Sequence, residues 1–203
     1  MNTLLLTDSY KVTHFNAYPP GMTDMFSFFE SRGGKYSETV FFGLQYFLKK
    51  YLETPITQVD VEEAASLYKA HFGMELLNYD GWSYIAQKLG GRLPVRIRAV
   101  PEGSVVPTKN VLMTVESTDP KVPWVVNYLE GLLSQVWYPT TVATQSREMK
   151  KDILVGLHVS GDPSTIGFKL HDFGFRGSTN PESAALGGAA HLVNFLGTDT
   201  VPA

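Results

Sequence analysis

The spacing of apolar residues changes along this chain, and that change constrains the fold more than any other feature of the sequence. Apolar residues recur at helical spacing in three early segments, and we expect helices at Phe41–Leu52, Val61–Phe72 and Gly81–Leu89. Across Arg92–Ser117 apolar residues recur at every second position instead. Val95, Ile97 and Ala99 alternate with arginines there, which predicts an antiparallel sheet segment. A chain that contains both periods is expected to fold as a mixture of helices and strands.

The flanking regions complete the expected element order. The first 40 residues are rich in aromatic residues and turn formers, which predicts extended segments and turns. Thr118–Pro120 resembles a helix N-terminus, and we expect a buried apolar helix from there through Val136. Three later elements are expected: a helix from Thr141 to about Leu157, a short strand at Ile166–Leu170, and a helix from Glu182 to Phe195. A strand, a glycine-containing loop and a helix in this order indicate an α/β architecture, in which ligand sites lie at strand carboxyl ends.

Length and composition exclude several classes of protein. The chain has 203 residues, enough for one large or two small domains, and its 43% hydrophobic content excludes disorder as the main state. Its basic residues are scattered and its formal net charge is −3, which disfavours a dedicated nucleic-acid binder. Because it contains no cysteine, disulfides, thiolate metal sites and cysteine nucleophiles are excluded, and a reducing compartment fits.

The sequence also predicts no targeting or membrane segment. The start, MNTLLLTDSYK, lacks the basic region and the long apolar run of a secretory signal. The longest apolar region, Val122–Ala143, is interrupted by polar residues and does not reach the roughly 20 apolar residues of a membrane span. We therefore expect a cytoplasmic protein.

Lys169–Gly177, with the sequence KLHDFGFRG, is the densest cluster of chemically useful side chains. An arginine can bind phosphate or a carbonyl group through two donors, and a phenylalanine can stack on a flat ring. The segment therefore suits a planar or anionic ligand at the end of the expected strand. The residues alone leave a second interpretation open, in which a phenylalanine anchors a turn and Asp172 pairs with Arg176.

Other polar clusters allow both a functional and a structural interpretation. Thr7–His14 is strongly polar, and it could instead be an exposed arm whose Asp or Ser caps a helix. Gly197–Thr200 reads as a turn after an apolar helix. Gly187 and Gly188 are expected to allow close packing, because no phosphate-binding glycine motif surrounds them. Three histidines without ligand partners at helical spacing are expected to be structural or on the surface: His71, His158 and His191.

Seven blocks, in order along the chain, resemble the nicotinamide phosphoribosyltransferase family. They are TDSYKVTHF at 7–15, FSFFESR at 26–32, VFFGLQYFL at 40–48, LPVRIRAVPEGSVVP at 93–107, WYPTTVATQSRE at 137–148, KLHDFGFRG at 169–177 and HLVNFLGTDTV at 191–201. The resemblance covers nearly the whole chain, but only the amino-terminal portion, less than half, of a full-length member.

The resemblance implies a type II phosphoribosyltransferase fold, in which an α/β sandwich domain precedes an irregular α/β barrel. Residues 1–140 would form the sandwich domain, and residues 141–203 the first part of the barrel. The implied reaction joins nicotinamide to phosphoribosyl pyrophosphate with Mg²⁺, giving nicotinamide mononucleotide and pyrophosphate in NAD salvage. Members act as homodimers with sites at the subunit interface, and no Mg²⁺ ligand is identified in this chain.

The resemblance also implies roles for six residues, all of them in substrate binding. Phe173 matches the phenylalanine on one face of the nicotinamide ring, and Tyr10 matches the tyrosine that the second subunit brings to the other face. Three matches concern polar groups: Arg176 beside the amide and phosphate, Asp199 receiving the carboxamide NH₂, and Arg32 reaching the phosphate region across the dimer. Asp8 lies on the same partner-supplied arm as Tyr10. No catalytic side chain is implied within the chain, because positioning of the ring nitrogen suffices for the reaction.

Two alternatives remain beside this interpretation: a phosphoribosyltransferase acting on nicotinic acid, and a non-catalytic dimerisation or regulatory remnant. Asp199 distinguishes a nicotinamide enzyme from one that acts on nicotinic acid, because a carboxylate would repel nicotinic acid while accepting a hydrogen bond from an amide. The chain stops shortly after Asp199, before the barrel segments that supply most ribose and pyrophosphate contacts in the family. We therefore expect a fragment, or half of a split enzyme that needs a carboxyl-terminal partner, and no turnover by this chain alone.

Overall fold

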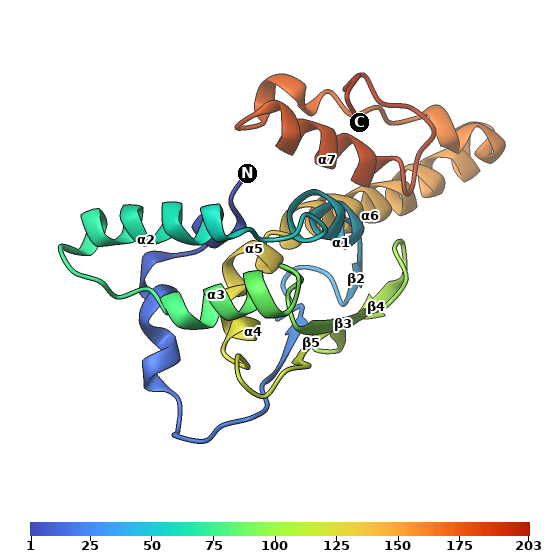
Figure 1. The fold of residues 1–203 in the computed structure, drawn as a ribbon. Coiled ribbons are helices and arrows are strands. Elements are labelled where there is room, and N and C mark those ends of the chain that lie inside the picture. The colour runs from blue at the N-terminus through green and yellow to red at the C-terminus, as the bar shows by residue number, and fades with distance from the viewer. The chain divides into compact units, whose positions relative to one another are not determined.

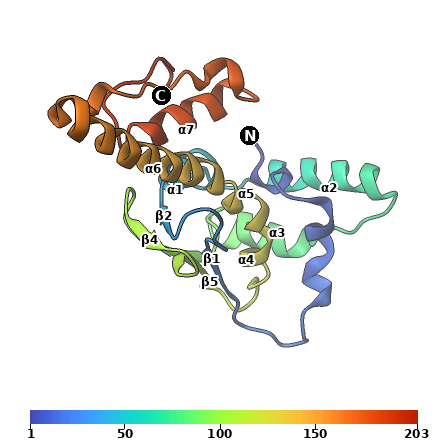
Figure 2. The same cartoon turned by 180° about the vertical axis from the view of Figure 1, so that it is seen from behind.

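The computed structural model describes residues 1–203, and the chain forms two compact units whose segments interleave along the sequence. Unit 1 comprises Met1–Phe29, Gln45–Ala99 and Met113–Gln135. Unit 2 comprises Glu30–Leu44, Val100–Leu112 and Val136–Ala203. Figures 1 and 2 show the helices and strands from two sides. The mixed helix-and-strand fold expected from the sequence is confirmed, whereas the division into residues 1–140 and 141–203 stays a prediction.

Unit 1 combines short helices with most of a three-stranded sheet. The strands are β1 (Phe26–Glu30), β3 (Val95–Ala99) and β5 (Val111–Ser117), in the order β1-β5-β3. Strand β3 pairs antiparallel with β5, with Val95 opposite Ser117 and Ala99 opposite Met113, as the alternating pattern predicts. The helical elements are two 3₁₀ segments (Thr3–Leu5 and Ser9–Ala17), α1 (Leu44–Phe47) with a following π-helical turn (Leu48–Leu52), α2 (Gln58–Phe72), α3 (Tyr79–Lys88), α4 (Val125–Tyr128) and α5 (Glu130–Ser134).

Local sequence explains the two longest helices of unit 1. Thr57 and Asp60 form a capping box at the start of α2, because each side chain accepts the other residue's backbone N–H. Gly73 ends the helix with φ 73°, a left-handed conformation that glycine adopts without steric cost. At the start of α3 the Asn78 side chain accepts the Gly81 N–H at 3.0 Å. The helices expected from apolar spacing in these two regions are confirmed.

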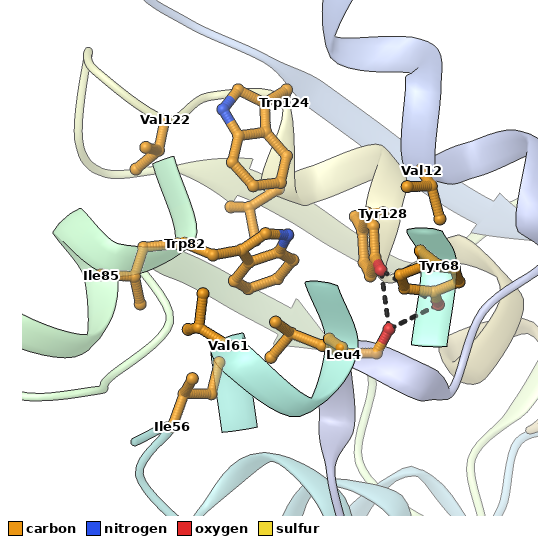
Figure 3. Packing of buried hydrophobic residues seen from close by; sticks show 12 residues of the cluster. Leu4, Val12, Ile56, Val61, Tyr68, Trp82, Ile85, Val122, Trp124 and Tyr128 are labelled. Carbon is orange, nitrogen blue, oxygen red and sulfur yellow. Dashed lines mark hydrogen bonds between the residues drawn. The ribbon is translucent and has the colours of Figure 1, made fainter. Parts of the chain in front are cut away.

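The core of unit 1 is an aromatic cluster that encloses the amino-terminal segment. Trp82 is fully buried, and its ring meets those of Trp124 and Tyr128 edge to face, with centroids 5.0 and 4.9 Å away. Leu4 is also fully buried, and its carbonyl oxygen accepts hydrogen bonds from the Tyr68 and Tyr128 hydroxyls, as Figure 3 shows. These contacts fix the backbone just before the polar segment that begins at Thr7.

Unit 2 is built around one long helix. Its elements are β2 (Glu38–Val40), β4 (Val105–Pro107), α6 (Trp137–Ser160), two 3₁₀ segments (Pro163–Phe168 and Gly174–Gly177) and α7 (Pro181–His191). Strands β2 and β4 pair antiparallel, and β2 bonds to α6 through the Val40 N–H and the Thr144 hydroxyl at 2.9 Å. A Cβ on Gly187 would lie 2.9 Å from the Tyr138 Oη of α6, which confirms that the Gly187-Gly188 pair serves close packing.

Several elements differ from the sequence predictions. The first 40 residues, expected as extended segments and turns, also contain the 3₁₀ helices Thr3–Leu5 and Ser9–Ala17. Ile166–Leu170 is not a strand, because Asp162 accepts the Ser164 N–H, Pro163 occupies the first helical turn, and a 3₁₀ helix runs to Phe168. The expected helix from Thr118 to Val136 begins only at Val125, after Pro123, and is divided into α4 and α5, although its burial is confirmed. The last helix ends at His191 rather than Phe195. No helix of the chain is both long enough and apolar enough to cross a membrane.

Candidate functional site

The loop of the KLHDFGFRG segment presents two of the predicted site residues at the surface of unit 2. Phe173 precedes the 3₁₀ turn Gly174–Gly177 and is 71% exposed, so a ring face is available for stacking. Arg176 lies within the same turn, is exposed, and forms no ion pair with any acidic side chain. An exposed aromatic ring and an unpaired guanidinium therefore lie three residues apart on one turn.

Asp172 joins this loop to the segment that carries Asp199. The Asp199 N–H donates to the Asp172 carbonyl oxygen at 2.9 Å, and Asp172 forms a parallel bridge with Thr198. The Asp172 carboxylate accepts from the Gly174 N–H at 3.0 Å and from the hydroxyls of Thr198 and Thr200 at 3.2 and 2.5 Å. The alternative in which Asp172 pairs with Arg176 is wrong, because these other donors occupy its carboxylate.

Asp199 is half exposed and contacts the imidazole of His171. The distance from Asp199 Oδ2 to His171 Nδ1 is 3.2 Å, with 49% of the aspartate side chain and 38% of the histidine side chain exposed. Asp199 Oδ1 forms no hydrogen bond within the chain, so it can accept one from a ligand. Gly197 allows the close approach of His171, because a Cβ there would lie 2.6 Å from the imidazole Nε2.

A buried histidine connects the KLHDFGFRG segment to α6. His191 of α7 is 4% exposed, its Nδ1 lies 2.9 Å from the Ser146 Oγ of α6, and its Nε2 lies 3.0 Å from the Leu170 carbonyl oxygen. Its ring stacks on Phe195 with centroids 4.8 Å apart. The structural role predicted for this histidine is confirmed, and the other two, His71 and His158, are exposed on α2 and α6.

The remaining predicted site residues come from other parts of the chain. Asp8 and Tyr10 belong to unit 1, where both are exposed, and the Tyr10 hydroxyl lies 3.4 Å from Asp8 Oδ2. Asp8 precedes the 3₁₀ helix Ser9–Ala17 but makes no side-chain capping bond, so the capping role is not seen. Lys11, by contrast, is buried and pairs with Glu130, which ties this arm to α5. Asp8 and Thr7 also line a cavity of about 250 Å³ within unit 1.

Arg32 lies in unit 2 but apart from the loop contacts described above. It is exposed, follows β1, and forms no ion pair. The next two residues, Gly33 and Gly34, have φ of 100° and 152° and turn the chain toward β2. No hydrogen bond or ion pair joins Arg32 to Phe173, Arg176 or Asp199.

The structure thus brings together Phe173, Arg176 and Asp199 in one unit, and it adds contacts from three residues to which the sequence assigned no binding role. These are His171, Thr198 and Thr200, which contact Asp199 or Asp172 directly. His171 stands in the conspicuous KLHDFGFRG segment, whereas the signal of Thr198 and Thr200 in the sequence is weak, since Gly197–Thr200 alone is typical of an ordinary turn. No group of three or more His, Asp or Glu side chains in the chain could hold a metal ion.

Comparisons with known proteins cover both ends of the chain. Residues 2–97 match the family described as nicotinamide phosphoribosyltransferase, N-terminal domain, and residues 168–203 match the nicotinate phosphoribosyltransferase (NAPRTase) family. The nicotinamide phosphoribosyltransferase of Xanthomonas campestris pv. campestris is 57% identical over all of this chain and 43% of that protein. The Acinetobacter baylyi protein of the same name is 29% identical, again over the whole chain and 43% of its own length.

The fold is shared with solved structures. A crystal structure of human nicotinic acid phosphoribosyltransferase superposes with a TM-score of 0.63 at 21% identity, covering 97% of this chain and 36% of that one. At this identity the likeness concerns the fold alone. The chain spans less than half the length of the Xanthomonas and Acinetobacter relatives.

Proposed function

We propose that this chain, which is similar along its whole length to the amino-terminal portion of nicotinamide phosphoribosyltransferases, forms that portion of an enzyme of this kind. The complete enzyme would join nicotinamide to phosphoribosyl pyrophosphate and release nicotinamide mononucleotide and pyrophosphate. The observation that carries the proposal is the pairing of the Phe173 loop with the Asp199 segment through the Asp199 N–H and the Asp172 carbonyl. That pairing joins an aromatic face and an open carboxylate oxygen, the two groups that a flat amide ligand needs.

The exposed ring of Phe173 would stack on one face of nicotinamide. Stacking of aromatic pairs contributes about 0.5–1.5 kcal/mol beyond the buried area, and it fixes the plane of the ligand ring. Once the plane is fixed, the ring nitrogen can be held against the ribose carbon, so catalysis rests on positioning rather than on a nucleophilic side chain.

Asp199 would select the amide over the acid. Its Oδ1 is open and would accept a hydrogen bond from the carboxamide NH₂, while Oδ2 is already occupied by His171. Nicotinic acid would place a second carboxylate against the first, and a like-charge contact of this kind costs several kcal/mol. The names of the relatives agree with this preference, and the nicotinic acid alternative is not favoured.

Two arginines would bind phosphate groups. Arg176 and Arg32 are both exposed and form no ion pair, so each guanidinium is available to the ribose phosphate or the pyrophosphate. Tyr10 and Asp8, exposed on the amino-terminal arm, would be supplied by a second copy in a homodimer, with the tyrosine closing the other face of the ring.

Mg²⁺ would enter with the pyrophosphate substrate. Within the chain no three His, Asp or Glu side chains lie together, so these residues do not fit a metal site of their own. Because the chain spans less than half the length of its relatives, we expect the 203 residues alone not to turn over substrate.

The proposal can be tested with a completed protein, in which this chain is joined to the residues that follow the matched segment in the Xanthomonas campestris relative. We expect nicotinamide mononucleotide from nicotinamide and phosphoribosyl pyrophosphate, detected by mass spectrometry. Phe173→Ala should raise KM for nicotinamide about ten-fold, because the stacking contact is lost. Phe26→Ala is the matched control, since this phenylalanine is similarly exposed, at 61%, but lies on β1 of unit 1. Absence of product from a folded completed protein, or equal effects of the two substitutions, would contradict the proposal.

A further inference from the structure

One carboxylate accepts hydrogen bonds from both segments of the proposed nicotinamide site. Asp172 Oδ1 takes the Gly174 N–H, at the start of the turn that carries Arg176. Asp172 Oδ2 takes the hydroxyls of Thr198 and Thr200, the residues on either side of Asp199. Phe173 follows Asp172 directly, so this single side chain is bonded to the loop of the ring-stacking residue and to the segment of the amide-binding residue.

The geometry around Asp199 follows from these bonds. Thr198 and Thr200 both direct their hydroxyls to Asp172 Oδ2, whereas the Asp199 side chain contacts His171 instead. The Thr200 side chain is anchored most firmly, because it is only 1% exposed and lies 2.5 Å from the carboxylate. Because Thr198 and Thr200 are both bonded to Asp172 Oδ2, Asp199 between them is held in place while its own carboxylate stays half exposed.

Helix α7 restricts the space available to this network. A Cβ on Gly188 would lie 3.4 Å from Asp172 Oδ2 and 3.2 Å from the Thr200 Cβ, so the helix backbone approaches both side chains closely. Charge-assisted hydrogen bonds to an ionised carboxylate are roughly twice as strong as neutral ones, and partial burial strengthens them further. The carboxylate is therefore a rigid junction rather than a free surface group.

We infer that Asp172 is a positioning residue for nicotinamide recognition, an inference that rests on the function proposed above. It does not touch the substrate itself. It holds the ring-stacking loop and the amide-binding segment at one fixed separation, so that a ring placed on Phe173 presents its amide to Asp199 Oδ1. Loss of the carboxylate leaves both groups present, with only the backbone bond from the Asp199 N–H to the Asp172 carbonyl and the bridge at Thr198 to hold them relative to each other.

The first test measures the junction directly and does not depend on activity. In Asp172→Ala, NMR-detected amide exchange of the 203-residue chain should accelerate about ten-fold at Gly174 and Asp199, because their bonds to residue 172 are lost or loosened. Asp162→Ala is a matched control: its Oδ1 accepts the Ser164 N–H at 2.9 Å in a similar turn, away from the site. The control should accelerate exchange near Ser164 only.

The second test uses the completed protein. Asp172→Ala should raise KM for nicotinamide about ten-fold with kcat changed less than about three-fold, because the pre-set geometry for binding is lost. Asp172→Asn keeps an acceptor for the Gly174 N–H but places an NH₂ group where the Thr198 and Thr200 hydroxyls donate, and should recover only part of the affinity. If Asp172→Ala does not fold, Thr200→Val removes one donor from the junction and should produce the same changes in smaller degree.

The two tests separate the inference from the function on which it rests. Unchanged exchange at Gly174 and Asp199 in Asp172→Ala would overturn the inference whatever the activity. A fall in kcat with KM unchanged would also overturn it, since that pattern belongs to a group acting on the reacting atoms. If the unsubstituted completed protein makes no product, the proposed function fails, and the role of Asp172 in recognition falls with it, even where accelerated exchange shows the junction itself.

Discussion

Removing both tyrosine hydroxyls that bond the Leu4 carbonyl should cost more than the two separate removals added together. The carbonyl oxygen lies 2.8 Å from Tyr68 Oη and 2.7 Å from Tyr128 Oη, and the three residues are at most 5% exposed (Figure 3). No other donor bonds this oxygen. In either single Phe variant the carbonyl keeps one partner, but in the double variant it is buried without any.

The expected magnitudes follow from this difference. Each single substitution removes one bond to the Leu4 carbonyl, together with the long 3.4 Å contact between the two hydroxyls, and should lower the free energy of unfolding by about 1 kcal/mol. The double variant loses both bonds and also leaves a buried acceptor unsatisfied, which adds roughly 1–3 kcal/mol. The total of about 3–5 kcal/mol exceeds the sum of the single effects, so the double-mutant cycle should give a coupling energy of about 1–3 kcal/mol.

Urea unfolding followed by tryptophan fluorescence can measure the cycle. A Trp137→Phe background leaves Trp82 and Trp124, which both lie in the unit 1 cluster, as the only tryptophans of the chain. Tyr84→Phe is a suitable control, because this hydroxyl bonds Asp119 at 3.0 Å and not Leu4, so its effect should add to that of Tyr128→Phe. If Tyr68→Phe and Tyr128→Phe are also additive within about 0.5 kcal/mol, the carbonyl is not held in the way described.

Three further predictions test the fold. Burial raises the pKa of Tyr128 above its ordinary value, so the contribution of this tyrosine to stability should be constant below about pH 10 and be lost at higher pH, and urea unfolding of Tyr128→Phe should show a weaker alkaline loss. Gly91→Ala would place a Cβ 2.2 Å from the Ile56 carbonyl oxygen at a φ of 74°, whereas Gly90→Ala, at a φ of 63°, meets no atom within 4 Å. We expect thermal unfolding to show a loss of about 1–2 kcal/mol for Gly90→Ala and about 1–3 kcal/mol more for Gly91→Ala; equal losses would refute the clash. Gly156→Ala, in α6 with open space around it, should instead stabilise the chain by about 0.5–1 kcal/mol in the same assay.

Helices with local signals could be predicted from the sequence. The apolar spacing of Val61–Phe72 and the glycine that follows are properties of neighbouring residues, and α2 ends at Phe72 as expected. The alternation of apolar and polar residues in β3 is also a local property, because successive side chains of a strand point to opposite faces of the sheet. In both cases the information that determines the element lies within a few residues of it.

Ile166–Leu170 could not be predicted in this way. Its apolar residues are typical of a strand, but a strand needs a partner with free backbone groups, and none pairs with it here. Asp162 and Pro163 instead start a helical turn that uses local hydrogen bonds. Whether this segment forms a strand depends on a neighbouring strand being present in the folded chain, and the spacing of residues does not reveal that.

The candidate site shows the same limit. Phe173 and Arg176 stand in one conspicuous segment and could be singled out from the sequence. The junction with Asp199 depends on bonds between Asp172 and residues 26 and 28 positions later, and no local pattern predicts those. The resemblance to a family identified Asp199, whereas the role of Thr198 and Thr200 emerged only from the structure.

Substrate preference is the most direct test of the proposed function. The measurement is the ratio of kcat/KM for nicotinamide to that for nicotinic acid in the completed protein, with and without Asp199→Asn. We predict a clear preference for nicotinamide, reduced by about ten-fold or more when the charge facing the amide is removed. A preference for nicotinic acid, or a ratio that the substitution does not change, would contradict the account.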